Sequence, residues 1–329
     1  MAQPRVSAEA VDLVVGVPDG TPVIAQQLTT LAAAGLTVAR PRPSLTRTLT
    51  DYLSLTKPRI MLLLLITEIS ALVVAAHGRL QLGLVLTAMA GGALSAGGAA
   101  AVNCWYDRDI DLVMSRTCQR PLPAGRIPPS HALAFGCLLG LAGFVVLALG
   151  ANLVAASLAL GGGVFYAVVY TMWLKRSFIQ NIVIGGAAGA IPPLVGWAAV
   201  THGLSPLALV LFAIIFCWTP PHFWALALLI RREYVRAGVP MLPAVRGDVA
   251  TRRAIVLYSV LLFGISLVPT IWLGTAYLVS GGILGLVFVG LSLVTFRDGG
   301  RRSAAILFHY SVAYLGLLFV TMALTATLA

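Results

Sequence analysis

Residues 207–216 read Leu-Ala-Leu-Val-Leu-Phe-Ala-Ile-Ile-Phe and residues 60–66 read Ile-Met-Leu-Leu-Leu-Leu-Ile, and such continuously apolar stretches decide the fold class. The strands of a membrane barrel would alternate apolar and polar side chains over about ten residues. A spanning helix needs about 20 consecutive apolar residues instead. Hydrophobic residues make up 59% of the 329 residues and charged residues 10%, unlike a soluble domain. The sequence therefore predicts an all-α, polytopic membrane protein.

The apolar stretches predict nine transmembrane helices, at residues 60–76, 82–102, 131–148, 151–170, 181–200, 206–229, 254–273, 277–296 and 304–327. Connections on one side are short, at 77–81, 149–150, 201–205 and 274–276. Those on the other side include three long polar segments, 103–130, 171–180 and 230–253. We therefore expect a site on that side. Gly and Ala crowd residues 91–101, which predicts close packing of that helix.

Basic residues are distributed very unevenly between the two sides. Of the 22 Lys and Arg residues, only Arg79 falls outside the N-terminal segment and the connections on the side of the long segments. Cytoplasmic segments carry such an excess. We therefore expect a cell-membrane protein whose N-terminus and site are cytoplasmic and whose C-terminus is outside. The same distribution explains the net charge of +11 and argues against a nucleic-acid partner.

The N-terminal segment differs from the rest in composition. It lacks the basic, apolar and cleavage-site pattern of a signal peptide, and Glu9, Asp12 and Asp19 argue against a mitochondrial transit peptide. We expect a weakly ordered cytoplasmic extension at 1–50 and a transmembrane domain at 51–329. The four cysteines show no Cys-x-x-Cys spacing, so free thiols are expected.

The connection after the second span begins Asn103-Cys-Trp-Tyr-Asp107-Arg-Asp-Ile-Asp111. A spacing of four places Asn103, Asp107 and Asp111 on one face of a helix. Mg²⁺ prefers oxygen ligands and is usually held by one or two carboxylates together with substrate phosphates. The motif therefore predicts a Mg²⁺ site for a phosphorylated substrate. The alternative is a solvated loop in which the aspartates pair with Arg108 and Arg116.

Basic residues in two connections suit the phosphates of such a substrate. Arg116 and Arg120 follow the acidic face directly, and a planar guanidinium matches phosphate oxygens. Lys175 and Arg176 follow the fourth span. Anchoring of helices at the membrane surface is the alternative for both pairs. Asp109 points away from the acidic face. We expect it either to pair with an arginine or to contact the metal-binding side chains without touching the metal.

A third group lies in and after the sixth span, where Pro220 and Pro221 interrupt an apolar run. Proline removes hydrogen bonds from a helix, so we expect a break that lines a cavity. His222 follows this break and is a functional candidate, with a packed, hydrogen-bonded histidine as the alternative. Glu233, in the next connection, is the natural second carboxylate for a metal. Its alternative is an ion pair with a neighbouring arginine.

Together these segments resemble the UbiA-type intramembrane prenyltransferases, and within them the branch of protohaem IX farnesyltransferases, or haem O synthases. The resemblance covers residues from about 51 to 325. Its general motif is Asn103, Asp107 and Asp111, and its more specific motifs are Thr56–Ile60, Asp107–Leu122, Asn181–Trp197, Thr219–Trp224 and Ala237–Pro243. The aspartate-rich second cluster of other members is not evident, and Glu233 stands where Asp is more usual in this branch.

The resemblance implies nine helices around a central cavity and a farnesyl transfer. Farnesyl diphosphate and the 2-vinyl group of haem B would give haem O and diphosphate, with haem as a substrate rather than a cofactor. Asn103, Asp107 and Asp111 are implied to hold Mg²⁺, with Glu233 as the candidate for a second metal site. Haem A synthase, the downstream enzyme, is an expected partner.

The resemblance also implies roles for the basic residues and the histidine. Diphosphate contacts are implied for Arg116, Arg120, Lys175 and Arg176, and Lys57 and Arg59 lie at the same membrane face. The expected catalytic residues are Asn103, Asp107, Asp111, Arg116, Arg120 and His222, the last as a residue that orients or transiently ligates haem.

Two other functions compete with this one. A related prenyltransferase would act on a quinone precursor or another tetrapyrrole, but the runs Thr219–Trp224 and Ala237–Pro243 argue against it. A transporter would place its site near the middle of the membrane and often shows internal repeats. Here the acidic groups gather at one face, and no convincing inverted repeat is evident.

Overall fold

The computed structural model describes residues 44–328, so most of the extension expected at 1–50 lies outside this range, and residues 45–50 of it belong to the helix α3. Every regular element in the described range is a helix. In chain order the helices are α3 (Leu45–Leu55), α4 (Pro58–Ala75), α5 (Leu82–Tyr106), α6 (Arg108–Val113), α7 (Pro129–Gly150), α8 (Leu153–Val164), η1 (Phe165–Leu174), α9 (Lys175–Ser177), α10 (Asn181–Gly189), α11 (Ile191–Thr201), α12 (Pro206–Leu229), α13 (Arg231–Arg236), α14 (Leu242–Val245), α15 (Gly247–Leu267), α16 (Thr270–Asp298) and α17 (Arg301–Leu328).

Within residues 44–328, nine helical segments are long and apolar enough to cross a membrane, which confirms the expected number. They are α4, α5, α7, α8 with η1 and α9, α10 with α11, α12, α15, α16 and α17. Large apolar side chains such as Leu138, Leu257 and Ile283 are exposed along them. Apolar surface of this kind suits lipid rather than water. The chain is a multi-pass membrane protein.

The sixth span contradicts one prediction. α12 runs unbroken from Pro206 to Leu229 with Pro220 and Pro221 inside it, so the expected break before His222 is wrong. Just ahead of the prolines, the hydroxyl of Thr219 donates to a backbone carbonyl one turn earlier, at 2.8 Å. Membrane helices tolerate proline where Ser and Thr side chains and neighbouring helices satisfy the freed backbone groups.

Three other spans depart from a straight α-helix. The fifth divides at Ala190, between α10 and α11 and just ahead of two prolines. The fourth continues from α8 into a π-helix of 10 residues, η1, and such segments often occur at functional sites. Gly274, with φ 73°, kinks α16, so the connection expected at 274–276 lies inside that helix.

The small residues of α5 pack closely, as predicted. A side chain added at Gly98 would lie 2.6 Å from the carbonyl oxygen of Gly136, and one at Gly143 would lie 2.7 Å from the backbone nitrogen of Ser95. α5 and α7 therefore meet backbone to backbone, an approach that only small residues permit.

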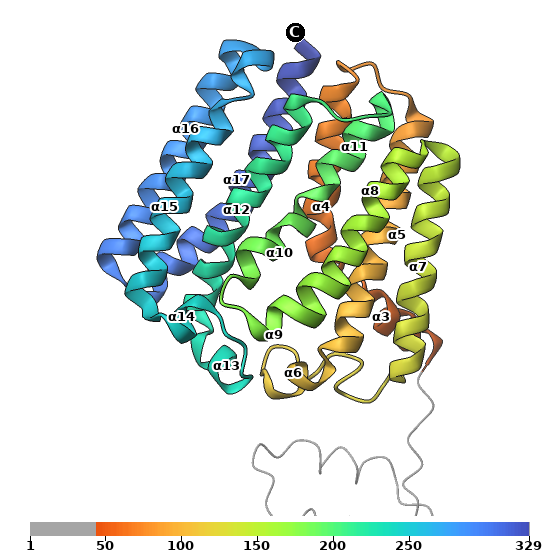
Figure 1. Cartoon of the computed structure of the whole chain (residues 1–329), viewed down its shortest axis with the longest axis vertical. Helices are drawn as coiled ribbons and strands as arrows, with labels where there is room; N and C mark the ends of the chain where they lie inside the picture. The colour runs from red at the N-terminus through yellow and green to blue at the C-terminus, as the bar shows by residue number, and fades with distance from the viewer. Residues whose placement is uncertain (1–43, 329) are drawn as a thin grey trace, which may run out of the picture. The chain divides into compact units, whose positions relative to one another are not determined.

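The polar connections gather at one end of the helical bundle. Figure 1 shows α6, α9, α13 and α14 at this end and the C-terminus at the opposite end. We term it the charged end, and it comprises residues 57–59, 103–126, 175–178 and 231–248. The fold thus brings all three predicted polar segments together.

Candidate active site at the charged end

The acidic motif keeps helical spacing although one helix ends inside it. α5 ends at Tyr106, and Asp107 is the joint before α6. The backbone N–H of Asp107 donates to the carbonyl of Asn103 at 2.9 Å, and that of Asp111 to the carbonyl of Asp107 at 2.8 Å. The three side chains therefore share a face, as predicted. Asn103, Asp107 and Asp111 are 4%, 2% and 4% exposed.

Asn103 is the centre of a hydrogen-bond network. Its Nδ2 donates to Oδ2 of Asp107 at 2.8 Å and to Oγ1 of Thr171 at 2.9 Å, while its Oδ1 accepts from Nζ of Lys57 at 2.6 Å. Lys57 adopts φ 53° and ψ 59° directly before Pro58. This left-handed conformation is costly for a residue with a side chain and often marks a functional site. It brings the ammonium group of Lys57 to the amide of Asn103.

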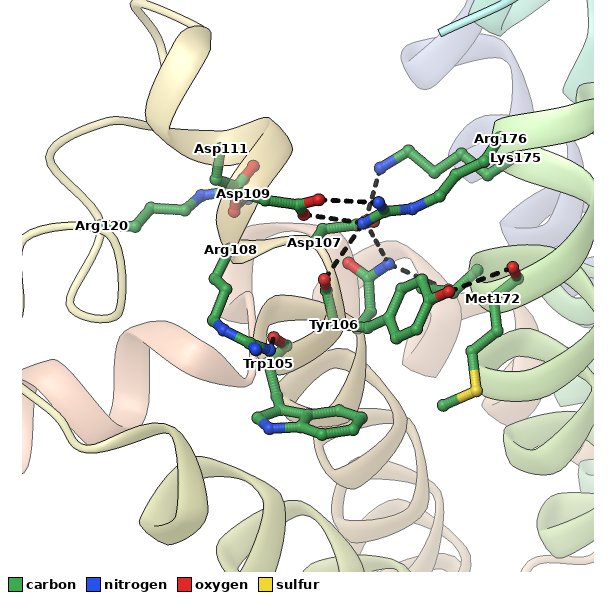
Figure 2. Close-up of polar contacts among 12 residues, drawn as sticks. Trp105, Tyr106, Asp107, Arg108, Asp109, Asp111, Arg120, Met172, Lys175 and Arg176 are labelled. Atoms are coloured by element: carbon green, nitrogen blue, oxygen red, sulfur yellow. Dashed lines mark hydrogen bonds and ion pairs between the residues drawn. The ribbon is translucent and has the colours of Figure 1, made fainter. Parts of the chain in front are cut away.

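The fourth span supplies the cations that face the aspartates (Figure 2). Nζ of Lys175 lies 2.5 Å from Oδ2 of Asp107, and Nη2 of Arg176 lies 3.5 Å from Oδ1 of the same carboxylate. Arg176 also grips Asp109 with both terminal nitrogens, each at 2.7 Å. These two hydrogen bonds lower the pKa of Asp109 to about 2. Asp109 is thus paired with an arginine, one of its two expected roles.

Asp111 has its own basic partner in the loop that follows. Nη1 of Arg120 lies 2.9 Å from Oδ2 of Asp111. Arg108 donates instead to the carbonyl oxygen of Trp105 at 2.7 Å. The aspartates therefore pair with Arg120, Lys175 and Arg176 rather than with Arg108 and Arg116.

The π-helix explains how the fourth span reaches this network. The hydroxyl of Thr171 donates to the carbonyl of Tyr166, five residues earlier, at 2.8 Å and accepts from Asn103. Thr171 is fully buried. The sequence reasoning missed this residue, because a threonine in an apolar span carries no signal of its own.

Glu233 on α13 reaches the loop after the acidic motif. The hydroxyl of Ser115 donates to Oε1 of Glu233 at 2.9 Å, and Oε2 is buried with no hydrogen-bond partner among the described residues. Burial raises the pKa of the neighbouring Tyr234, Arg116 opposes the increase, and Glu233 adds to it. The Arg116 side chain is exposed, and it lies close enough to Tyr234 to affect its pKa.

The oxygen atoms of this region fit Mg²⁺. Oδ1 of Asp107 and Oε2 of Glu233 are both buried acceptors without a hydrogen bond from the described residues. No three His, Cys, Asp or Glu side chains cluster as a metal site within residues 44–328. Asn103, Asp107 and Asp111 offer two carboxylates and one amide, and Mg²⁺ bound in this way completes its ligands with water and substrate phosphates.

The remaining predicted residues lie outside this network. Nδ1 of His222 is 2.6 Å from Oγ of Ser311, and its ring stacks between Trp218 and Phe308 with centroid distances of 4.3 and 4.9 Å. Arg59 is exposed at the start of α4. Side-chain contacts thus join Lys57, Asn103, Asp107, Lys175 and Arg176, and Asp111 pairs with Arg120 beside them. His222 and Arg59 have no direct bond to these residues in the described part of the chain.

Curated relatives share about half of the sequence. A protein of Gloeobacter violaceus is 54% identical, over 85% of this chain and 93% of its own. One of Symbiobacterium thermophilum is 52% identical, over 88% and 99%. One of Roseiflexus is 52% identical over 86% of this chain, which spans only 53% of that relative. All three carry the name protoheme IX farnesyltransferase.

Solved structures with the same fold are more distant in sequence. A digeranylgeranylglyceryl phosphate synthase structure gives a TM-score of 0.71 at 19% identity, covering 85% of this chain and 99% of its own. A UbiA homolog from Archaeoglobus fulgidus, bound to DMAPP and Mg²⁺, gives 0.62 at 14% identity, over 83% and 99%. The model of the UbiA prenyltransferase family matches residues 64–325, and the chain therefore belongs to that family.

Proposed function

We propose that this protein transfers the farnesyl group of farnesyl diphosphate to the 2-vinyl group of haem B, giving haem O and diphosphate. The observation that carries the proposal is the network in which Lys57, Lys175 and Arg120 face Asn103, Asp107 and Asp111 at one end of a membrane bundle. The curated relatives that are about half identical and named for this reaction support the choice of substrates.

The basic residues are suited to the departure of diphosphate. Breaking the allylic carbon–oxygen bond leaves negative charge on the diphosphate, and cations placed in advance stabilise that charge. Lys57, Arg120 and Lys175 are already held at the acidic face, and we assign them, with Arg176 and Arg116, to the diphosphate oxygens. Mg²⁺ held by Asn103, Asp107 and Asp111 would act as a Lewis acid on the same group.

Glu233 is our candidate for a second metal site. The hydroxyl of Ser115 fixes one carboxylate oxygen and leaves the other buried without a partner. A buried carboxylate oxygen without a donor is costly, and a cation would remove that cost. The Ser115–Glu233 bond also ties the loop after α6 to α13, so the second carboxylate is held beside the first motif.

The acceptor is positioned from the membrane side of this network. The haem vinyl group attacks the allylic carbon, water adds to the resulting cation, and one proton is released. We assign His222 to the orientation of haem. The bond between Nδ1 and Ser311 and the stacking on Trp218 fix the ring, so that only Nε2 can act as a ligand or hydrogen-bond partner.

We further propose that the charged end faces the cytoplasm of a cell membrane, with the N-terminus inside and the C-terminus outside. The support is the gathering of Lys and Arg at that end, because cytoplasmic segments carry such an excess. Haem O would then be released for oxidation by haem A synthase, the downstream partner we expect.

Membranes containing the protein test the proposal directly. Incubation with haem B, farnesyl diphosphate and Mg²⁺ should yield haem O by mass spectrometry, and omission of Mg²⁺ should stop its formation. The proposal is wrong if haem B remains unchanged while the same membranes prenylate 4-hydroxybenzoate.

A further inference from the structure

Glu68 is a carboxylic acid buried inside a membrane span. It belongs to α4, is 2% exposed, and its Oε1 has no hydrogen-bond partner within the described range. A buried polar group without a partner is costly. An ionisable residue at such depth is therefore a candidate functional residue by default.

Its position is related to the active site by simple helix geometry. Glu68 follows Lys57 by eleven residues, and Gly92 precedes Asn103 by the same number. Eleven residues are just over three helical turns, so each pair lies on one face of its helix, about 16 Å apart. Lys57 bonds to Asn103 at one level, and a side chain added at Gly92 would overlap the Glu68 carboxylate at the other. We term the line between these two levels the α4–α5 seam.

The exposure of the α4 side chains changes abruptly at the level of Glu68. Every residue of α4 from Pro58 to Ile66 is at least partly accessible, whereas Thr67–Ala75 are buried except for Ile69. On α5, Ala96 and Ala99 are partly accessible, and Gly92 is buried. On α4, accessible side chains therefore extend from the charged end to Ile66, and the buried stretch begins at the level of Glu68.

We propose that Glu68 forms the far wall of the path taken by the prenyl chain and thereby limits its length. This inference rests on the proposed function, in which the diphosphate is held by Lys57 and its neighbours. An extended farnesyl chain advances about 1.25 Å per carbon–carbon bond, or about 14 Å in all, which matches the length of the seam. A chain one isoprene unit longer would have to displace the carboxyl group.

Two glycines hold this wall in place. A side chain at Gly92 on α5 would collide with the carboxylate, and one at Gly196 on α11 would collide with the backbone carbonyl of Glu68. Three helices thus fix the position of one residue. Displacing the carboxyl group would cost free energy, because the surrounding helices leave it no alternative position, and an apolar chain end offers it no hydrogen bond in return.

A competition experiment tests the wall. The protein is given haem B with equal amounts of farnesyl and geranylgeranyl diphosphate, and the products are compared by mass spectrometry. Glu68→Ala should raise the share of the longer product about tenfold, because the shortened side chain opens the end of the seam. Glu68→Gln has almost the same size and should keep the wild-type ratio. Thr67→Val, at the neighbouring buried position, is the matched control and should also leave it unchanged.

A second variant tests the wall from the opposite direction. Gly92→Ala should force the carboxyl group along the seam and shift the preference towards geranyl diphosphate. An active Glu68→Ala protein with the wild-type ratio of long to short products would overturn the inference. So would a Gly92→Ala protein that favours longer chains.

A binding measurement separates this inference from the proposed function. Unreactive thiolo analogues of farnesyl and geranylgeranyl diphosphate, added with Mg²⁺, should stabilise the purified wild type unequally against heat, in favour of farnesyl. Glu68→Ala should remove this difference. If wild type fails to prenylate haem but shows this pattern, the choice of acceptor is wrong and the wall stands. Equal stabilisation of the wild type by both analogues would contradict the wall.

Discussion

The two ends of the α4–α5 seam present opposite solutions to burying polar groups. At the charged end, bonds of 2.6 and 2.8 Å link Lys57, Asn103 and Asp107, and Lys175 faces the Asp107 carboxylate as its counter-ion. Three turns deeper, the same helices hold Glu68 beside a glycine, with one oxygen left unpartnered. One pair of helices can therefore bind a charged group at one end and border an apolar chain along the rest of its length.

Breaking the charged end should have the largest effect. Asp107→Asn and Asp111→Asn each remove a carboxylate that faces lysine or arginine, and we expect haem O formation to fall by about a thousandfold. Initial rates on purified protein, at equal expression, provide the measurement. Asp248→Asn is the control, because Asp248 forms an exposed pair with Arg231 at the same end. Full activity of both site variants would refute the metal assignment.

Changes at Glu233, the candidate second carboxylate ligand, should have a smaller effect. Glu233→Gln should raise the Mg²⁺ concentration that gives half-maximal rate by about tenfold, because the buried Oε2 loses its charge. Ser115→Ala keeps that charge and removes one hydrogen bond, so its shift should be smaller. The titration is made at saturating farnesyl diphosphate. An unchanged Mg²⁺ requirement in Glu233→Gln would place this residue outside the metal site.

His222 offers a way to separate the two substrates. His222→Phe should raise the KM for haem about tenfold and leave that for farnesyl diphosphate unchanged, because the ring lies away from the lysines and aspartates. Steady-state kinetics with each substrate varied in turn measures both constants. Equal changes in the two constants would indicate a packing role, the alternative left open by the sequence.

The smallest effect concerns the exposed edge of the charged end. Arg176 lowers the pKa of Asp109 to about 2, below its ordinary value of about 3.9. The pair therefore stabilises the fold fully above about pH 4 and loses this contribution as the pH falls through 2. Because the Asp109 side chain is 60% exposed, we expect less than about 1 kcal/mol. The midpoint temperatures of thermal unfolding of wild type and Asp109→Asn should differ slightly at pH 6. They should become equal only below pH 4. Convergence already at pH 5 would contradict this.

The four-residue spacing of Asn103, Asp107 and Asp111 predicted the acidic face, because residues four apart lie on the same face of a helix. The sequence could not pair Asp107 with Lys175, since they lie 68 residues apart and only the packing of α5 against the fourth span brings them together. The basic residues near each motif were found, but their partners were not.

Other misses have specific physical causes. Two prolines suggested a broken helix, yet α12 runs continuously from Pro206 to Leu229 with both of them inside it. Lys57 adopts a left-handed backbone and bonds to Asn103, and no local sequence pattern reveals either feature. Glu68 was overlooked despite a clear signal, a single acid in an apolar run of eighteen residues, Pro58–Ala75.

The central claim is that the charged end carries out farnesyl transfer to haem. Mass spectrometry of haem extracted after incubation of the purified protein with haem B, farnesyl diphosphate and Mg²⁺ tests it most directly. We predict a new species with the mass of haem O in the wild type and none in Asp107→Asn. Unmodified haem B in the wild type, under conditions in which it prenylates another acceptor, would contradict the claim.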